Sequence, residues 1–248
     1  SLINLLLKSN EKKPYFIEHG WSSPDGLKVP NGKTLWKSSK NLLSPDTSIT
    51  LSWDNGEGIT FYQDISVDDT FMFTINQRVK NNTNNAVTLY PYGLIRRTGE
   101  PETTKFFVLH EGPLGVFDGT LSEKSYEDLA ESGQKGINIK PAESGGWTGL
   151  TDKYWMTALV PPKNKNFKST FLYKNSFKAN YILNNPIKIN KGTKEQSDVQ
   201  LFVSAKEVET IDRYAADQNI NKFDLVIDWG WFYFFTKPLF FVIDYLFK

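Results

Sequence analysis

Residues 48–65 read Ser48-Ile-Thr-Leu-Ser-Trp53-Asp-Asn-Gly-Glu-Gly58-Ile-Thr-Phe-Tyr-Gln-Asp-Ile65, and this stretch decides the fold. Apolar and polar residues alternate in both halves, a period typical of a strand with one buried face. Between the halves, Asn55-Gly56 is a strong hairpin signal, because both residue types tolerate positive φ. The stretch therefore predicts two antiparallel strands joined by a tight turn.

The same alternation continues along the chain. Thr70–Lys80 and Ala86–Ile95 alternate on either side of a polar turn at Asn81–Asn85. Further strand candidates are Lys105–His110, Leu114–Phe117, Tyr154–Val160, Phe167–Tyr173, Ser176–Ile182 and Asp198–Val203. Strands and helices do not alternate as they do in parallel sheets, so we expect antiparallel sheets. The sequence predicts a mainly β chain, with one large antiparallel sandwich over residues 1–203.

Two segments depart from this pattern. Ser122–Lys140 is polar and punctuated by glycine, which predicts a surface excursion. Residues 204–248 read as a C-terminal helical segment, beginning with a capping box at Ser204-Ala-Lys-Glu207. We expect a helix over Ser204–Gln218 that packs on the sandwich through Val208, Ile211 and Ala215, followed by a strand-like Phe223–Trp229.

Composition excludes several classes of function. The chain has 248 residues, of which 39% are hydrophobic and 15% aromatic, enough to build a sizeable core. Its net charge of +1 provides no field to attract nucleic acid. Cysteine is absent and there are two histidines, which argues against thiolate chemistry and multi-histidine metal sites. We expect no cofactor and no metal.

The candidate catalytic groups are weak. His110-Glu111 are adjacent along an expected strand, where neighbours point to opposite faces, so we interpret them as a strand end followed by a solvated turn. His19 reads as a loop residue, and Arg96-Arg97 as surface ion-pair partners. The acidic cluster around Glu127 lacks the spacing of a calcium loop. The sequence therefore predicts no catalytic residue and no enzyme.

The last segment carries the most information. On a helical wheel, the polar residues of Trp231–Lys248 form a narrow stripe of Tyr233, Lys237, Asp244 and Lys248. The surround is apolar and aromatic, a pattern that suits a helix lying in a membrane interface. A helix packed on the sandwich remains an equal alternative. The candidate residues for this membrane-coupling helix are Trp229, Trp231, Phe234, Phe235, Lys237, Pro238, Leu239, Phe240, Val242 and Leu246. Pro238 should kink the helix or mark its first turn.

Two motifs resemble a known family. Gly145-Gly146-Trp147 followed by Lys153-Tyr154-Trp155 is similar to a signature of the large periplasmic domain of the YidC membrane protein insertases. Ile227-Asp-Trp-Gly-Trp231, followed by Thr236-Lys-Pro-Leu-Phe240, resembles the stretch that leads into that family's second transmembrane helix. Supporting matches are Tyr15–Trp21, His110–Pro113 and Leu201–Lys206, so the resemblance spans the chain.

The resemblance implies a β-supersandwich with C-terminal helices, on the periplasmic side of the inner membrane of a Gram-negative bacterium. It implies a piece of a longer chain, whose transmembrane part performs insertion and lies outside these residues. It also implies a partner, the SecDF component of the Sec translocon, and a last helix closely tied to function. The expected role is a non-catalytic interaction and scaffold module.

Alternatives remain open at this point. A sugar-binding or aldose-epimerase-like domain would need a concave face with converging histidine and carboxylate groups. A chaperone-like groove would hold unfolded segments against exposed aromatic side chains. For the glycine motif we expect a structural role, with Gly145 and Gly146 permitting a close backbone approach and with Trp147 and Trp155 in the core.

Overall fold

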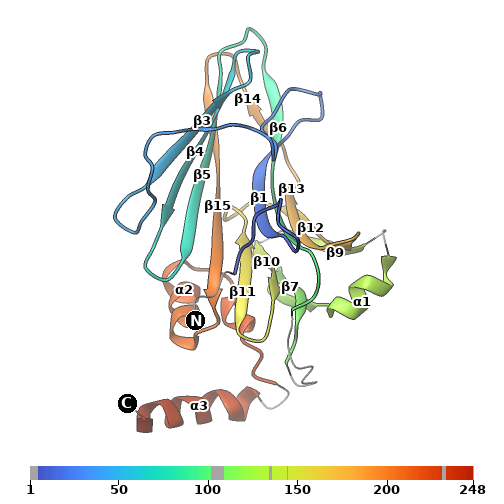
Figure 1. Ribbon diagram of the computed structural model, residues 1–248, viewed down its shortest axis with the longest axis vertical. Coiled ribbons are helices and arrows are strands. Elements are labelled where there is room, and N and C mark those ends of the chain that lie inside the picture. Colours follow the sequence, from blue (N-terminus) through green and yellow to red (C-terminus); the bar gives the residue numbers. More distant parts are fainter. Residues whose placement is uncertain (1–4, 102–108, 134–135, 144, 231–232, 248) are drawn as a thin grey trace.

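Two antiparallel sheets face each other in the computed structural model, which describes residues 5–101, 109–133, 136–143, 145–230 and 233–247 (Figure 1). Within these ranges the smaller sheet runs β1 (Tyr15–Ser22), β6 (Val87–Arg97), β13 (Phe177–Leu183), β12 (Phe167–Tyr173) and β9 (Ile137–Ala142), with β14 (Ile187–Ile189) also paired to β6. The larger sheet runs β2 (Lys37–Ser38), β3 (Ile49–Asp54), β4 (Ile59–Val67), β5 (Met72–Asn81), β15 (Lys194–Ala205), β11 (Trp155–Val160), β10 (Gly146–Thr151), β7 (Gly112–Phe117) and β8 (Thr120–Glu123). The predicted mainly β antiparallel sandwich is confirmed.

The hairpin in residues 48–65 forms as the sequence predicts. β3 pairs with β4 from Ile49 opposite Ile65 to Asp54 opposite Thr60. Positive φ falls on the two glycines of the turn, whereas Asn55 holds the turn with its side chain. The Asn55 Oδ1 accepts the backbone N–H groups of Glu57 and Ile59 at 2.7 and 3.1 Å.

The turn at residues 81–85 has an additional task, because it carries the chain from the larger sheet to the smaller one. β5 pairs with β4 and β15, while β6 pairs with β1, β13 and β14. The buried Asn81 amide donates to the carbonyl groups of Asn85 and Ile189, at 2.8 and 3.0 Å. This crossing places β5 and β6 in opposite layers.

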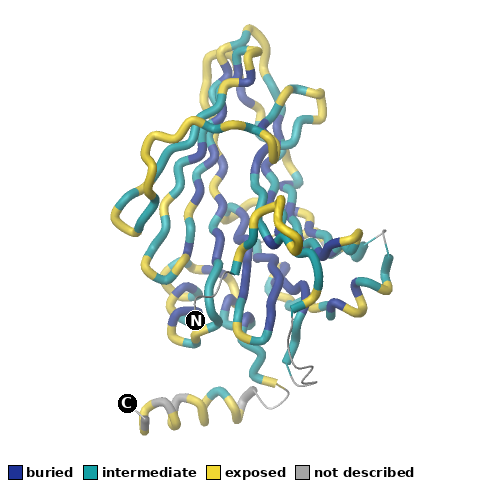
Figure 2. Tube along the Cα trace, viewed as in Figure 1, coloured by how far each residue is buried: buried dark blue, intermediate teal, exposed yellow. Residues whose placement is uncertain are grey.

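The core divides into three apolar clusters, and buried residues follow the interior of the sandwich in Figure 2. One cluster lies between the sheets and includes Ile95, Leu159 and Phe171. A second, around Trp21 and Phe61, involves the strands at the upper end of Figure 1. The third lies between the larger sheet and the C-terminal elements α2 (Val208–Asp217) and the 3₁₀ turn η2 (Phe223–Val226). β7 is buried along its whole length, because both of its faces are covered.

The predicted capping box at Ser204 is wrong. Ser204 belongs to β15, where it pairs with Met156 of β11, and the strand ends at Ala205. α2 begins at Val208, and its N-cap residue Glu207 makes no side-chain capping bond. Continuing the ladder satisfies the backbone through residue 205, which a helix starting at Ser204 would forfeit. Of the three residues expected to pack α2 on the sandwich, Ile211 is fully buried.

The strand-like reading of Phe223–Trp229 is also wrong. Phe223–Val226 forms the turn η2, because Phe223 is drawn into the third cluster. The Phe223 ring packs edge-on against Trp147 and Phe202, each with ring centroids 5.5 Å apart. The apolar run therefore reflects a buried turn with no strand partner.

The excursion predicted for Ser122–Lys140 turns out to be part of the fold. It contains the end of β8, the helix α1 (Tyr126–Glu131) and the start of β9. The Ser125 Oγ accepts the Asp128 backbone N–H while the Asp128 carboxylate accepts that of Ser125, so a capping box starts α1. Tyr126 and Leu129 are buried. Of the predicted strand Lys105–His110, residues 105–108 lie outside the described residues.

Candidate functional site

The helix α3 (Tyr233–Phe247) is the outermost element of the molecule. It lies across the lower end of the sandwich in Figure 1, joined to the domain by the segment after η2. Pro238 lies inside the helix, where it removes one backbone donor. Of the helices in the described part of the chain, none has the length and apolar character needed to cross a bilayer.

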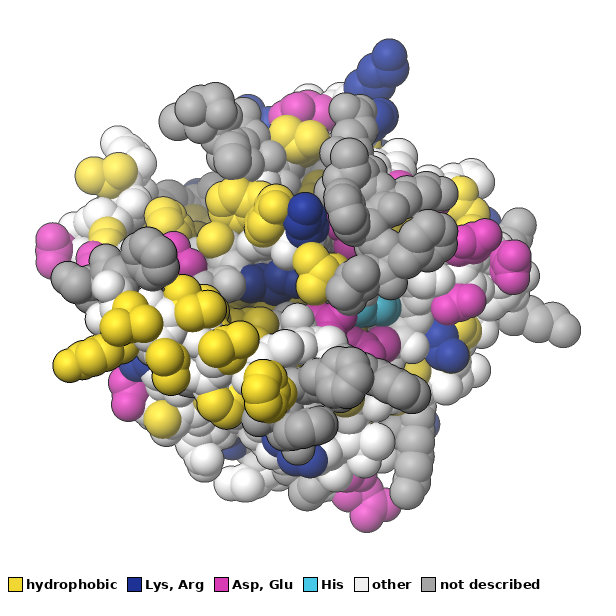
Figure 3. Space-filling model, turned by 90° about the horizontal axis from the view of Figure 1, so that it is seen from below, with side chains coloured by type: hydrophobic (Ala, Val, Ile, Leu, Met, Phe, Trp, Pro, Cys, Tyr) yellow, Lys and Arg dark blue, Asp and Glu magenta, His cyan; other side chains and the backbone are white. Residues whose placement is uncertain are grey.

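The face of α3 that points away from the domain is apolar. Phe235, Val242 and Leu246 are 68%, 55% and 73% exposed. They lie within about 40° of each other at 100° per residue, so they share one face. Leu239, Phe240, Ile243 and Tyr245 are exposed as well. Figure 3 shows hydrophobic side chains gathered at this end of the molecule, beside a hollow with charged side chains.

The polar side of α3 faces the domain. The Lys237 Nζ lies 3.6 Å from a carboxylate oxygen of Asp212 in α2 and 3.5 Å from one of Asp224 in η2. It also lies 5.9 Å from the centroid of the Trp229 ring. The usual arrangement of a surface helix is thereby reversed, since the charged residue faces the protein and the apolar residues face outward.

The segment before α3 ties the helix down at its start. The Thr236 hydroxyl donates to the Trp229 carbonyl at 2.8 Å. The Trp229 ring packs edge-on against Phe240, with centroids 5.5 Å apart. Asp228 accepts the backbone N–H of His110 at 3.0 Å and that of Gly230 at 2.8 Å. The N-terminal half of α3 is therefore held by a hydrogen bond and a ring contact to the segment that precedes it.

Several residues predicted for this helix are not described by the structure, wholly or in their side chains. Trp231 and Lys248 lie outside the described residues, as do the side chains of Tyr233, Phe234 and Asp244. The structure brings Trp229, Lys237 and Phe240 together, and it places Phe235, Leu239, Val242 and Leu246 on the surface.

The glycine motif has the geometry of a close backbone approach. Gly145 and Gly146 have φ of 96° and 148°, and a Cβ on Gly146 would overlap with the Val116 carbonyl of the neighbouring strand. Trp147 is completely buried, with its ring against Phe223. The two glycines and Trp147 thus have the surroundings expected of a structural motif.

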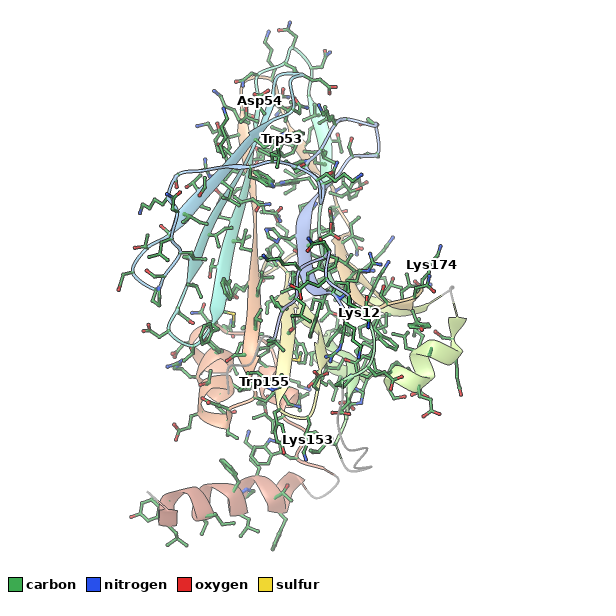
Figure 4. The ribbon with its side chains drawn as sticks, in the orientation of Figure 1. Lys12, Trp53, Asp54, Lys153, Trp155 and Lys174 are labelled. Carbon is green, nitrogen blue, oxygen red and sulfur yellow. The ribbon has the colours of Figure 1, made fainter. Side chains whose placement is uncertain are left out.

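The second half of that motif differs from expectation. Trp155 is only partly buried and does not belong to the core clusters. Tyr154 is 62% exposed, with the Lys153 Nζ 5.0 Å from its ring centroid. Lys153 and Tyr154 lie in the turn between β10 and β11, and Trp155 is the first residue of β11. Figure 4 places Lys153 at the end of the molecule nearest α3. Because β11 alternates its faces, Met156 takes the core position next to Trp155.

The two histidines lie in separate elements of the fold, His19 in β1 and His110 just before β7. His19 is a residue of β1, paired with Gly93, and so its reading as a loop residue is wrong. Burial lowers the His19 pKa to about 4. Glu111 accepts the backbone N–H of Lys153, at 3.0 Å. The expected solvated turn after His110 is also wrong, because Gly112 and Pro113 are buried in β7.

Two surface hollows are also candidate binding sites. One of about 490 Å³ lies beside β15 and is lined by residues including Pro161, Lys163 and Asp198. Another of about 600 Å³ lies on the smaller sheet and is lined by residues including Trp21, Tyr92 and Ile182. Neither contains a histidine.

The sequence did not predict a buried charged group that forms around Arg97 and Asp152. Arg97 is not a surface ion-pair residue: its side chain is 14% exposed and its Nη1 lies 2.5 Å from the Asp152 carboxylate. The Tyr126 hydroxyl donates to the same carboxylate at 3.2 Å, and the guanidinium lies 4.8 Å from the Tyr15 ring centroid. No local pattern links residues 97, 126 and 152, so only the fold reveals the group.

Residues 2–242 match the family model described as the YidC periplasmic domain. The chain belongs to this family. Membrane protein insertase YidC of Pelagibacter ubique is 42% identical over 248 residues, covering 99% of this chain and 44% of that protein. The YidC of Methylobacterium nodulans is 39% identical and covers 99% of this chain and 42% of that protein. The chain thus spans less than half the length of these YidC relatives.

The similarity to solved structures is remote. A galactose mutarotase related enzyme from Lactobacillus acidophilus aligns with a TM-score of 0.45 and 10% identity, over 68% of this chain and 70% of that one. A putative aldose 1-epimerase from Klebsiella pneumoniae gives 0.42 and 11%, over 71% and 54%. Likeness at this level carries no conclusion about activity.

Proposed function

We propose that this YidC periplasmic domain is a non-catalytic interaction and scaffold module, which rests on the membrane surface through α3. The observation that carries the proposal is the reversed polarity of α3. Phe235, Val242 and Leu246 face outward, while Lys237 is turned toward Asp212 and Asp224. An exposed apolar patch of this kind normally has a partner.

A lipid surface suits α3 better than a spanning arrangement. A lysine at the centre of a bilayer costs roughly 2.5–3.5 kcal/mol, and Lys237 lies within the helix. Lying flat, the helix can bury Phe235, Leu239 and Leu246 among the acyl chains near the headgroups while Lys237 keeps its acidic partners.

The β10–β11 turn supports the same orientation. Tyr154 is exposed and Lys153 lies over its ring, and Figure 4 places Lys153 at the end of the domain nearest α3. Tyrosine is enriched at the headgroup level of membranes, and lysine side chains reach from there into water. This end of the molecule is therefore our candidate for the membrane-facing side.

The wider role follows from the family. YidC relatives are named membrane protein insertases, and the resemblance implies the periplasmic side of the inner membrane. We propose that the transmembrane part of the insertase and Sec translocon components of the SecDF type are its partners. Nucleic acid is not among them, because the net charge is only +1.

The alternative is a sugar-binding or aldose-epimerase-like activity, and the residues do not favour it. Such chemistry needs a histidine and a carboxylate converging on one concave face. His19 lies between the sheets, and the Glu111 carboxylate accepts a backbone N–H. Epimerisation of an aldose by the purified chain, lost on His110→Ala, would overturn the non-catalytic assignment.

Flotation with vesicles of phosphatidylethanolamine and phosphatidylglycerol tests the membrane role. We expect the chain to float with the vesicles, and a chain ending at residue 230 to remain at the bottom. The double variant Phe235→Ser/Leu239→Ser should lose most of the floating fraction, because it makes the exposed face polar.

The matched control is Leu35→Ser/Leu42→Ser. Both leucines are exposed, at 89% and 67%, and lie in the loop region before β3. This variant removes similar apolar surface elsewhere and should float like the unchanged chain. If the chain ending at residue 230 binds vesicles as well as the intact chain, α3 is not the membrane element.

A further inference from the structure

A band of polar side chains crosses the interior of the sandwich between two of its apolar clusters. On the smaller sheet, His19 of β1 is level with Gly93 of β6, which is level with Tyr181 of β13. On the larger sheet, Gln63 of β4 is level with Gln77 of β5. Both rows include buried residues, and residues that are directly paired across the strands of a sheet point to the same face.

The two rows meet across the gap between the sheets. The Gln63 side chain approaches His19 closely enough to oppose part of the lowering of its pKa, although neither ring nitrogen attains hydrogen-bond geometry. On the smaller sheet the Tyr181 ring leans over Gly93, since a Cβ there would meet the Tyr181 Cε1. Tyr181 thereby fills the place beside His19 that Gly93 leaves free.

Five polar atoms of this band are buried without a hydrogen-bond partner among the residues that the structure describes. They are the Nδ1 and Nε2 of His19, the Oε1 and Nε2 of Gln77, and the Oη of Tyr181. Gln77 is completely buried and Tyr181 is 1% exposed. His19 is only partly buried as a residue, but both of its ring nitrogens are shielded from solvent. A folded protein rarely leaves so many polar atoms together unpaired.

We propose that His19, Gln77 and Tyr181 line an internal polar chamber that binds ordered water molecules and so links the two sheets through hydrogen bonds. Buried waters typically make about three hydrogen bonds to polar groups that lack other partners. The chamber supplies such groups from both layers of the sandwich.

The chemistry of the lining selects water over an ion. Burial disfavours the charged form of His19, which leaves a neutral ring with one donor and one acceptor. The Gln77 amide offers both kinds of group, and the Tyr181 hydroxyl can donate and accept. An anion would satisfy only the donors and a cation only the acceptors, whereas water does both.

Two buried tyrosines provide a matched test. Tyr181 and Tyr15 both lie in the cluster between the sheets, but the Tyr15 hydroxyl donates to the Thr157 Oγ1 at 2.9 Å. The measurement is ¹⁷O magnetic relaxation dispersion on the 248-residue chain, which counts waters that reside for longer than nanoseconds. We expect Tyr181→Phe and Gln77→Leu each to lower the count by at least one water, and Tyr15→Phe to leave it unchanged.

The midpoint of unfolding provides a second measurement, in which a water-bound and an unpaired Tyr181 hydroxyl give opposite results. If the Tyr181 hydroxyl is bound to water, Tyr181→Phe leaves the midpoint unchanged or lowers it. If the hydroxyl is unpaired, removing it relieves an unmet polar group and raises the midpoint. A raised midpoint in Tyr181→Phe, or an unchanged water count in both Tyr181→Phe and Gln77→Leu, would overturn the proposal.

Discussion

Arg97 and Asp152 come from opposite sheets and meet inside the domain, with 2.5 Å between the Nη1 and the carboxylate oxygen. Arg97 ends β6 of the smaller sheet, and Asp152 directly follows β10 of the larger one. The Tyr126 hydroxyl of α1 donates to the same carboxylate. Three elements are therefore joined at one charged group, directly beside the turn that carries Tyr154.

Removing one partner of this pair should be costly. We expect Asp152→Ala to lower the free energy of unfolding by roughly 3–5 kcal/mol, because it leaves the Arg97 guanidinium uncompensated in a site where it is 14% exposed. Urea denaturation measures the effect. Tyr126→Phe, which removes only a hydrogen bond, should cost about 1 kcal/mol. A cost for Asp152→Ala no greater than that of Tyr126→Phe would mean that solvent screens the pair.

The two motif tryptophans should respond differently to truncation. Trp147→Ala removes a completely buried ring that packs on Phe223, and we expect a loss of roughly 3–5 kcal/mol of stability. Trp155→Ala should cost clearly less, because Trp155 is only partly buried. Chemical denaturation of both variants in parallel decides the matter, and equal losses would contradict the assignment.

Stability should fall as the pH drops below about 6.5, because of His19. Its pKa is about 4 in the folded chain against 6.5 for the free side chain, so the unfolded chain binds the proton first. The contribution is complete above pH 6.5 and is lost as the pH falls toward 4, by about 3 kcal/mol at about 1.4 kcal/mol per pH unit. The free energy of unfolding, measured from pH 7 to 4, should show this slope.

His19→Gln is the control for that slope, since glutamine keeps a polar group at the site and does not titrate between pH 4 and 7. The difference in unfolding free energy between the two chains should shift in favour of the variant as the pH falls. Carboxylates titrate in both chains and largely cancel in the comparison. A difference that stays constant with pH would show that His19 can be protonated in the folded domain.

Local patterns in the sequence predicted the framework of the fold well. The hairpin at Asn55-Gly56 formed because alternation and turn chemistry agree within a few residues. The capping boxes show the limit of such patterns. Ser204 matches the pattern and lies in a strand, whereas Ser125 caps α1 in a segment that reads as a loop. Pairing with β11 decided the first case and burial of Leu129 the second, and neither is visible locally.

Interior polar groups were beyond the sequence for a related reason. Arg97 and Asp152 are brought together by the packing of one sheet on the other, as are His19 and Gln63. The apolar face of α3 could be predicted from the sequence, because helical periodicity alone groups its apolar residues. The direction in which that face points could be determined only from the contacts of Lys237 with Asp212 and Asp224.

Lys237 gives the most direct control over the position of α3. Its Nζ lies near carboxylates of Asp212 and Asp224, whose side chains are 36% and 39% exposed, so these are weak surface pairs. Reversing the charge with Lys237→Glu turns both attractions into repulsions and should detach α3 from the domain. We expect faster amide hydrogen exchange throughout α3 and a change in Trp229 fluorescence.

The domain itself should hardly be affected by this substitution, and the free energy of unfolding should change by less than about 1 kcal/mol. The matched control is Lys188→Glu, an identical charge change on the exposed side of β14, which should leave exchange in α3 as it was. Detached α3 would still carry its apolar face, so Lys237→Glu should continue to bind vesicles while the domain tumbles independently of them. If exchange in α3 is the same in Lys237→Glu and in Lys188→Glu, the two ion pairs do not hold the helix. In that case the Trp229–Phe240 contact would have to be sufficient to position it.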